Sequence, residues 1–88
     1  MAAPVFTLEI LTASRKVFVG EVTSLVAPGE IGYLGVLANH APLMTTLVPG
    51  QVTWRDAAGA TRMLRLAGRG ILEVQKNQAC LLADELSE

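Results

Sequence analysis

The chain contains one cysteine, Cys80, and one histidine, His40, in its 88 residues. A single cysteine excludes an internal disulfide, so the fold depends on side-chain packing alone, as suits a reducing compartment. A metal site needs three or four ligands that converge, and one histidine with one cysteine falls short of that number. The sequence therefore predicts neither a disulfide framework nor a metal centre.

Long apolar runs and an excess of charge are also missing. No apolar stretch approaches the roughly 18 residues that a membrane-spanning helix requires, so we expect contact with a membrane only through a partner. Charged residues make up 17% of the chain and the formal net charge is −1, which argues against a large basic surface for nucleic acid. Arg62, Arg65 and Arg69 form a local basic cluster, which favours solvated strand faces or partner contacts over a phosphate site.

Hydrophobic residues, by contrast, are abundant. They account for 51% of the sequence, which is typical of a globular chain and far from the composition of a disordered one. The length predicts one domain over residues 1–88. Cys80 lies within the apolar run 79–83, so we expect a small buried side chain and not a nucleophile.

Short segments with alternating polarity predict strands. In residues 5–11 the side chains of Phe6, Leu8 and Ile10 share one face, which is a period of two. A turn at 13–16 precedes a valine-rich strand at 17–26, with Gly20 as a bulge or bend and Pro28-Gly29 as its end. Residues 36–37 and 44–48 flank a loop that contains His40, and Pro49-Gly50 marks a further turn.

Two hairpins follow in the second half. Residues 51–55 and 61–66 are separated by a turn with Gly59 at the position that needs a positive φ. Residues 71–75 and 79–83 surround a turn at 76–78, and only 84–88 could begin a helix. Eight or more short strands predict an all-β sandwich or barrel. The side chains expected to point inward are Phe6, Leu8, Val22, Val26, Leu66 and Leu72.

Catalysis finds little support in the residues. His40 and Cys80 could pair as base and nucleophile, but no local motif joins them. The carboxylates are scattered over separate strands and loops, at Glu9, Glu21, Glu30 and Glu73. Gly29, Gly32 and Gly35 are spaced by three, yet no helix with a lysine follows them as a phosphate-binding loop would require. We therefore expect a chain that is not an enzyme by itself and holds no cofactor.

The loop around His40 gathers the large side chains Tyr33, His40, Leu43 and Met44. Exposed apolar and aromatic groups on one loop favour a protein interface. The alternative is that His40 is a turn residue whose ring bonds the local backbone, and the residues alone leave both readings open. Composition and spacing lead to a small all-β interaction domain.

Three strings in the right order resemble one known family. They are LEILTASRKVFVGEVTSLVAP, LGVLANHAPLMTTLVPG and GRGILEVQKNQACLLADELSE. Together they resemble the N-terminal domain of the epsilon subunit of F-type ATP synthases over nearly the whole chain. One small departure is Ala38, at a position where the family commonly has proline.

The resemblance implies a flattened ten-stranded β-sandwich and a role in the central stalk, the rotor of the enzyme. There the subunit packs against the gamma subunit and touches the membrane ring of c subunits, so that hydrogen ion transport is coupled to ATP synthesis. It implies a peripheral location at the cytoplasmic face of an energy-transducing membrane, the bacterial inner membrane. The alternative is a free-standing β-sandwich binding module, and a remote third possibility is a hydrolase that uses His40 and Cys80.

The resemblance also assigns contact residues. The ring would be met by Glu30, Tyr33, His40, Pro42 and Leu43, and the gamma subunit by Leu11, Thr12, Ser14 and Thr45. Family members typically continue into a C-terminal pair of helices, whereas these 88 residues offer barely one turn after Asp84. We expect the 88 residues to couple without inhibiting ATP hydrolysis through such helices, and without binding ATP.

Overall fold

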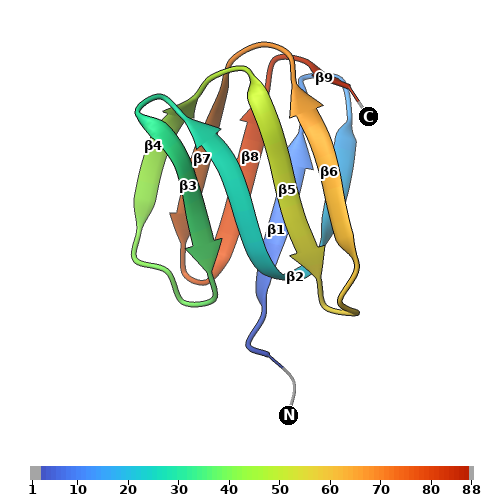
Figure 1. Ribbon diagram of the computed structural model, residues 1–88, viewed down its shortest axis with the longest axis vertical. Coiled ribbons are helices and arrows are strands. Elements are labelled where there is room, and N and C mark those ends of the chain that lie inside the picture. The colour runs from blue at the N-terminus through green and yellow to red at the C-terminus, as the bar shows by residue number, and fades with distance from the viewer. Residues whose placement is uncertain (1–2, 88) are drawn as a thin grey trace.

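Residues 3–87 are described by a computed structural model, in which they form nine strands and no helix (Figure 1). The longest, β2, has 14 residues, whereas β9 has two. The strands are β1 (Phe6–Leu11), β2 (Lys16–Gly29), β3 (Gly32–Leu37), β4 (Leu43–Leu47), β5 (Gly50–Asp56), β6 (Thr61–Leu66), β7 (Gly70–Gln75), β8 (Gln78–Ala83) and β9 (Leu86–Ser87). No helix in the described part of the chain could therefore cross a membrane.

The strands form two packed layers that share β2 (Figure 1). In one layer the second half of β2 pairs with β3 and β5, and β5 continues through β6 to β9. In the other, the first half of β2 pairs with β1, followed by β8, β7 and β4. The all-β sandwich is confirmed. The described residues contain nine strands where ten were expected, because β2 runs without a break through both layers.

The bulge in β2 lies at Thr23 and not at Gly20. The register with β5 shifts between Val22 and Ser24, and this extra residue reverses the alternation of side chains beyond it. Val22 points inward, but Val26 is 41% exposed, so the expectation that Val26 lies in the core is wrong. Gly20 instead leaves room for Phe18, whose ring would lie 3.0 Å from a Cβ there.

The turn that joins β2 to β3 also differs from the prediction. Pro28 and Gly29 do not break the strand before them but are the last two residues of β2, paired with Tyr33 and Gly32 of β3. At the other end of the chain, Leu86 and Ser87 form β9 against β6 where a helix start was considered. The remaining residue of that tail, 88, lies outside the described residues.

The core between the layers is apolar and contains no buried polar or charged residue among the described ones. Five of the six side chains that were expected to point inward do so, and Phe6, Leu8, Val22, Leu66 and Leu72 are at most 2% exposed. Trp54 packs against Phe18 with ring centroids 4.9 Å apart. The predicted hairpin turn at Gly59 is confirmed by its φ of 93°.

Asn77 connects three segments at one end of the sandwich. Its φ is 59°, a left-handed conformation that asparagine tolerates better than most residues. Its side-chain amide donates to the carbonyl of Val5 at 2.9 Å, and its side-chain oxygen accepts from the backbone N–H of Asn39 at 2.7 Å. The β7–β8 turn thus holds both the N-terminal segment and the β3–β4 loop.

We expect Asn77→Ala to lower the free energy of unfolding by about 2 kcal/mol. The substitution removes two hydrogen bonds, each contributing about 1 kcal/mol. It also places alanine, which tolerates a positive φ less well than asparagine, at this position. Urea unfolding followed by circular dichroism measures the change. Gln75→Ala, on the exposed face of the preceding strand, is the control and should shift stability by no more than about 0.5 kcal/mol. Equal effects of the two changes would contradict this role for Asn77.

Candidate functional site

The five residues predicted to meet a rotor ring lie at two opposite ends of the sandwich. The end with the β1–β2 and β2–β3 turns, residues 12–15 and 30–31, is here called the upper end (Figure 1). The lower end has the β3–β4 loop, residues 38–42, and the β7–β8 turn, residues 76–77. Strand β3, with six residues, separates the ends by about 20 Å.

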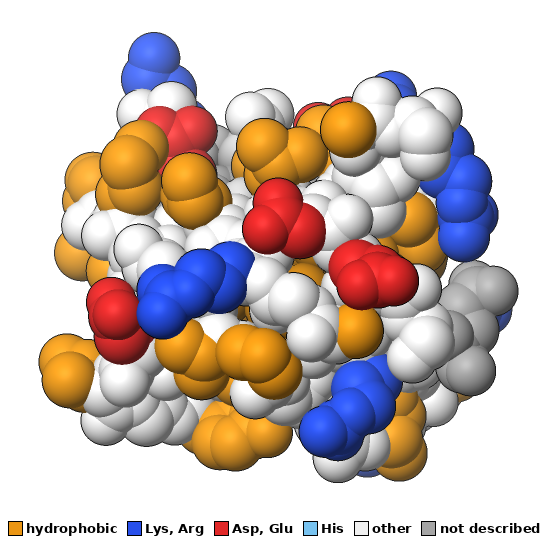
Figure 2. Space-filling view, turned by 90° about the horizontal axis from the view of Figure 1, so that it is seen from above, with side chains coloured by type: hydrophobic (Ala, Val, Ile, Leu, Met, Phe, Trp, Pro, Cys, Tyr) orange, Lys and Arg blue, Asp and Glu red, His pale blue; other side chains and the backbone are white. Residues whose placement is uncertain are grey.

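Glu30 and Tyr33 belong to the upper end. Glu30 pairs with Arg69 at 3.6 Å across the β2–β3 and β6–β7 turns. The Tyr33 hydroxyl accepts a hydrogen bond from the backbone N–H of Gln51 at 3.0 Å, although the side chain is largely exposed. Between them Ile31 is fully exposed. Figure 2 looks onto this end, where hydrophobic side chains lie between charged ones.

His40 and Pro42 lie at the lower end, and Leu43 begins β4 there. The His40 ring is half-buried, and its Nδ1–H donates to the carbonyl of Ala41 at 2.7 Å. The left-handed Asn39, with a φ of 63°, turns the chain immediately before it. This geometry gives His40 the local backbone contact that the turn reading expects.

A cavity of about 350 Å³ opens at the edge between β3 and β4. It brings together Tyr33 and Leu43 from the expected ring set with Thr45 from the expected gamma set. Ile31 and Leu34 complete its apolar wall, and Gly29 and Gly32 line it without side chains. Sequence spacing does not reveal this juxtaposition, since it depends on how the two layers stack.

The remaining residues of the expected gamma set lie at the upper end of β1. Leu11 ends the strand, and the Thr12 hydroxyl lies 3.3 Å from the Ser14 hydroxyl in the following turn. Thr12 also accepts from the backbone N–H of Arg15 at 3.3 Å. Thr45, on β4, lies three strands away from β1 in the same layer.

An apolar row that the sequence reasoning missed runs across this layer's outer face. Leu11 pairs with Leu82 on β8, which pairs with Ile71 on β7, which pairs with Thr46 on β4. Leu82 and Ile71 are each about half exposed. Neighbouring residues of a strand point to opposite faces, so the prediction that Leu72 points inward already places Ile71 on the outer face. Thr46, Ile71 and Leu82 also line a cavity of about 270 Å³, and the exposed apolar row with this hollow is suited to contact with another protein.

Cys80 lies in the next row of the same face, half-buried instead of buried. It is paired in register with Glu9 on one side and Glu73 on the other, and its thiol lies 3.9 Å from a Glu9 carboxylate oxygen. Burial, and then the charges of Glu9 and Glu73, raise the pKa of this thiol above its ordinary value. A raised pKa keeps the thiol protonated and unreactive.

We expect iodoacetamide to modify Cys80 more slowly in the folded protein than in the urea-unfolded chain at pH 8. The double change Glu9→Gln with Glu73→Gln should speed the folded reaction, because it removes two of the causes of the raised pKa. The folded state also holds this proton more tightly, so stability falls as pH rises above the unfolded thiol's pKa. Glu21→Gln is the control. A folded rate equal to the unfolded one would contradict this account.

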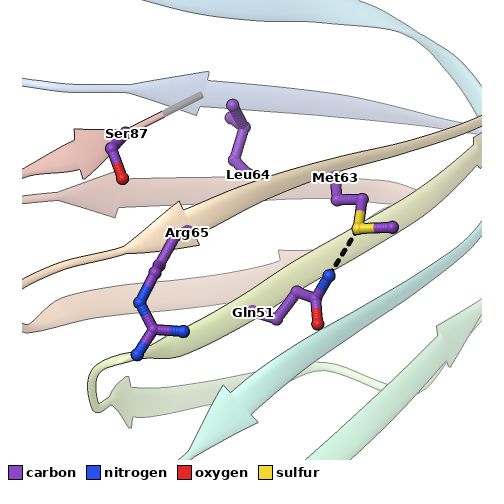
Figure 3. Close-up of a pocket in the computed structure, with 5 residues that line it drawn as sticks. All are labelled: Gln51, Met63, Leu64, Arg65 and Ser87. Atoms are coloured by element: carbon purple, nitrogen blue, oxygen red, sulfur yellow. Dashed lines mark hydrogen bonds between the residues drawn. The ribbon is translucent and has the colours of Figure 1, made fainter.

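The three arginines do not converge. Arg62 pairs with Asp56 and Arg69 with Glu30, each at 3.6 Å. Arg65 lines a shallow cavity of about 380 Å³ with the side chains of Gln51 and Met63, which hydrogen-bond to each other (Figure 3). The predicted preference for strand faces and partner contacts over a phosphate site agrees with this dispersal.

Within residues 3–87, the side chains that could bind a metal or act in catalysis do not converge either. No group of three or more histidine, cysteine, aspartate or glutamate side chains there could hold a metal ion. His40 lies in the lower-end loop, whereas Cys80 faces Glu9 on the outer face. Three exposed features could meet a partner: the Ile31 side chain at the upper end, the cavity between β3 and β4, and the apolar row. They define a β-sandwich interaction domain.

The chain belongs to the ATP synthase delta/epsilon family: the model of that family's beta-sandwich domain matches residues 5–88. The ATP synthase epsilon chain of Dichelobacter nodosus is 46% identical over 85 residues, covering 97% of this chain and 58% of the relative. That of Moorella thermoacetica is 47% identical over 77 residues, covering 88% and 57%. The chain thus spans somewhat more than half the length of these relatives.

Solved structures share the fold at low identity. A chain of the Euglena gracilis mitochondrial ATP synthase, in an assembly of OSCP, F1 and c-ring, matches with a TM-score of 0.87 at 18% identity. The match covers 98% of this chain and 55% of that one. A chain of the Tetrahymena thermophila central stalk and c-ring gives 0.81 at 12% identity, covering 100% and 69%.

Proposed function

We propose that this β-sandwich is a non-catalytic rotor element of a proton-translocating ATP synthase. It joins the gamma subunit to the ring of c subunits, so that proton-driven torque reaches the catalytic subunits. It is peripheral, at the cytoplasmic face of a bacterial inner membrane. The observation that carries the proposal is the pair of separate exposed surfaces, because an adaptor between two partners needs one surface for each.

The upper end is the surface proposed for the ring. The five expected residues lie toward both ends of β3, about 20 Å apart, and we propose that the ring meets the end that carries Glu30 and Tyr33. Glu30 and Tyr33 flank Ile31, a fully exposed apolar side chain that is a natural anchor for a partner. His40 and Pro42, at the opposite end, support the fold of their own loop instead.

The apolar row and the adjoining strand ends are the surface proposed for gamma. Leu11, Leu82 and Ile71 supply exposed apolar area, and Thr12 and Ser14 supply hydroxyls at its upper border. Apolar residues at the centre with polar groups around them are the usual arrangement of a protein interface. Thr45 and Leu43 contact a partner only where it reaches the edge cavity.

Binding to purified partners tests the proposal. The chain is mixed separately with the gamma subunit and with detergent-solubilised c ring of the same organism, and affinities are measured by biolayer interferometry. We expect Ile31→Asp to weaken ring binding at least about tenfold and to spare gamma, since burying an unpaired charge is costly. Leu82→Asp should do the reverse.

His40→Ala is the matched control at the lower end. It should change both affinities less than about twofold and stability by no more than about 0.5 kcal/mol. If His40→Ala weakens ring binding while Ile31→Asp does not, the proposed orientation is inverted and wrong. If the wild-type chain binds neither partner, the alternative of a free-standing binding module replaces the proposal.

A further inference from the structure

A second edge of the sandwich opens between the first half of β2 and β6, away from the β3–β4 edge (Figure 1). A cavity of about 290 Å³ lies there, with walls from both layers. None of its residues belongs to the two surfaces proposed for gamma and the ring. It is lined by Val17, Phe18, Trp54, Arg62, Met63 and Leu64.

Trp54 lines this cavity and carries a hydrogen-bond donor without an acceptor. Its side chain is only 4% exposed, and its buried Nε1–H has no hydrogen-bond partner among the described residues. A buried donor without a partner destabilises the folded protein relative to a paired one, and native proteins leave few of them. Phe18 packs against the indole with its ring inclined by 45°. A residue that lines the cavity therefore carries a donor for which no described residue supplies an acceptor.

Arg62 adds a positive charge at the same place. It is the register partner of Trp54 across β5 and β6, so the two side chains project from the same face. Its side chain is 59% exposed, and its Nε pairs with Asp56. Asp56 also accepts from the backbone N–H groups of Ala58 and Ala60 at 3.0 Å each. These two N–H groups help to neutralise the charge of the Asp56 carboxylate. The terminal guanidinium nitrogens of Arg62 therefore remain available to bind an anion.

We propose that this cavity binds a small amphiphilic carboxylate. The apolar body of the ligand lies between Phe18 and Leu64, and its carboxylate accepts hydrogen bonds from Trp54 Nε1 and the Arg62 guanidinium. A carboxylate fits because two donors, one of them charged, stand above apolar walls. The volume suits a ligand with one ring or a short chain. A change of rotamer among the lining side chains gives the ligand access to Nε1.

Trp54 is the only tryptophan in the chain, so a ¹⁵N-labelled sample gives one indole Nε1–H signal to follow by NMR. We expect 3-phenylpropionate to shift this signal with a Kd of about 1 mM, as suits a ligand of this size. The uncharged alcohol 3-phenylpropanol should bind at least about tenfold more weakly. An indole signal that 3-phenylpropionate does not move, or equal affinity for the alcohol, would overturn the proposal.

Variants separate this site from general apolar binding. Arg62→Gln should raise the Kd for 3-phenylpropionate about tenfold, the expected loss of a charge-assisted hydrogen bond. Arg65→Gln, on the same strand but outside the cavity, should leave it unchanged. Trp54→Phe, followed through the Leu64 backbone amide, should raise the Kd about tenfold while circular dichroism shows the fold retained. Equal effects of the two arginine changes would refute the assignment.

Discussion

Leu72→Ala is expected to lower the free energy of unfolding by about 2–5 kcal/mol. Leu72 is fully buried in β7, where it pairs with Leu81 on β8 and Thr45 on β4. Truncation removes apolar contacts and leaves a cavity that close-packed neighbours fill only in part. A domain of this size is stable by roughly 5–10 kcal/mol, so the change removes a large share of its stability.

The neighbouring position provides a matched control for that prediction. Ile71→Ala removes a similar side chain from the same strand, but Ile71 points outward and is about half exposed. It should cost clearly less than Leu72→Ala in the same urea titration. Equal losses at the two positions would mean that the inward face of β7 has been assigned wrongly. Ile71→Ala should still weaken gamma binding, which separates its stability role from its proposed contact.

Much of the fold could be predicted because its hairpins are local. The β5–β6 and β7–β8 turns carry Gly59 and Asn77, which are suited to a positive φ, and Lys76 adopts a positive φ beside Asn77. Strict alternation in β1 identified the buried face before any pairing was known. Where neighbouring residues alone determine the conformation, the prediction and the structure agree.

The errors in the first half of the chain fall where β2 changes partners. Its bulge at Thr23 follows from pairing with β1 on one side and β5 on the other, which no local pattern encodes. Val26 therefore points outward. A proline in a strand pattern predicts the end of the strand. Because β2 stops pairing with β5 at Val26, no N–H is needed toward β5 at Pro28, and the strand can continue through it.

The candidate surfaces were predictable only as a list of residues. A loop with special residues indicates an interface, but it cannot say which residues share a surface after folding. Strand β3 carries Tyr33 to one end and leads to His40 at the other, so that residues close in sequence become distant. Conversely, the apolar row of Leu11, Ile71 and Leu82 comes from three strands whose adjacency depends on topology.

The second prediction with a large expected effect concerns Gly70, beside that row, with Gly68 as its control. A Cβ on Gly70 would lie 2.8 Å from the Leu82 carbonyl oxygen and 3.5 Å from the Ala83 Cα. Backbone atoms within a paired sheet cannot move away without breaking the β7–β8 ladder. We expect Gly70→Ala to cost about 1–3 kcal/mol in urea unfolding, as overpacked sites do.

Gly68→Ala is the control for this steric argument, because a Cβ there would lie 3.4 Å from the Asp84 Cβ, an ordinary contact. It should leave stability unchanged or raise it by up to about 1 kcal/mol, since alanine restricts the unfolded chain. If both changes are neutral, β7 and β8 do not pack as closely as the structure has them. If Gly70→Ala destabilises and also weakens gamma binding, the same close approach that stabilises the sheet positions Ile71 and Leu82 in the apolar row.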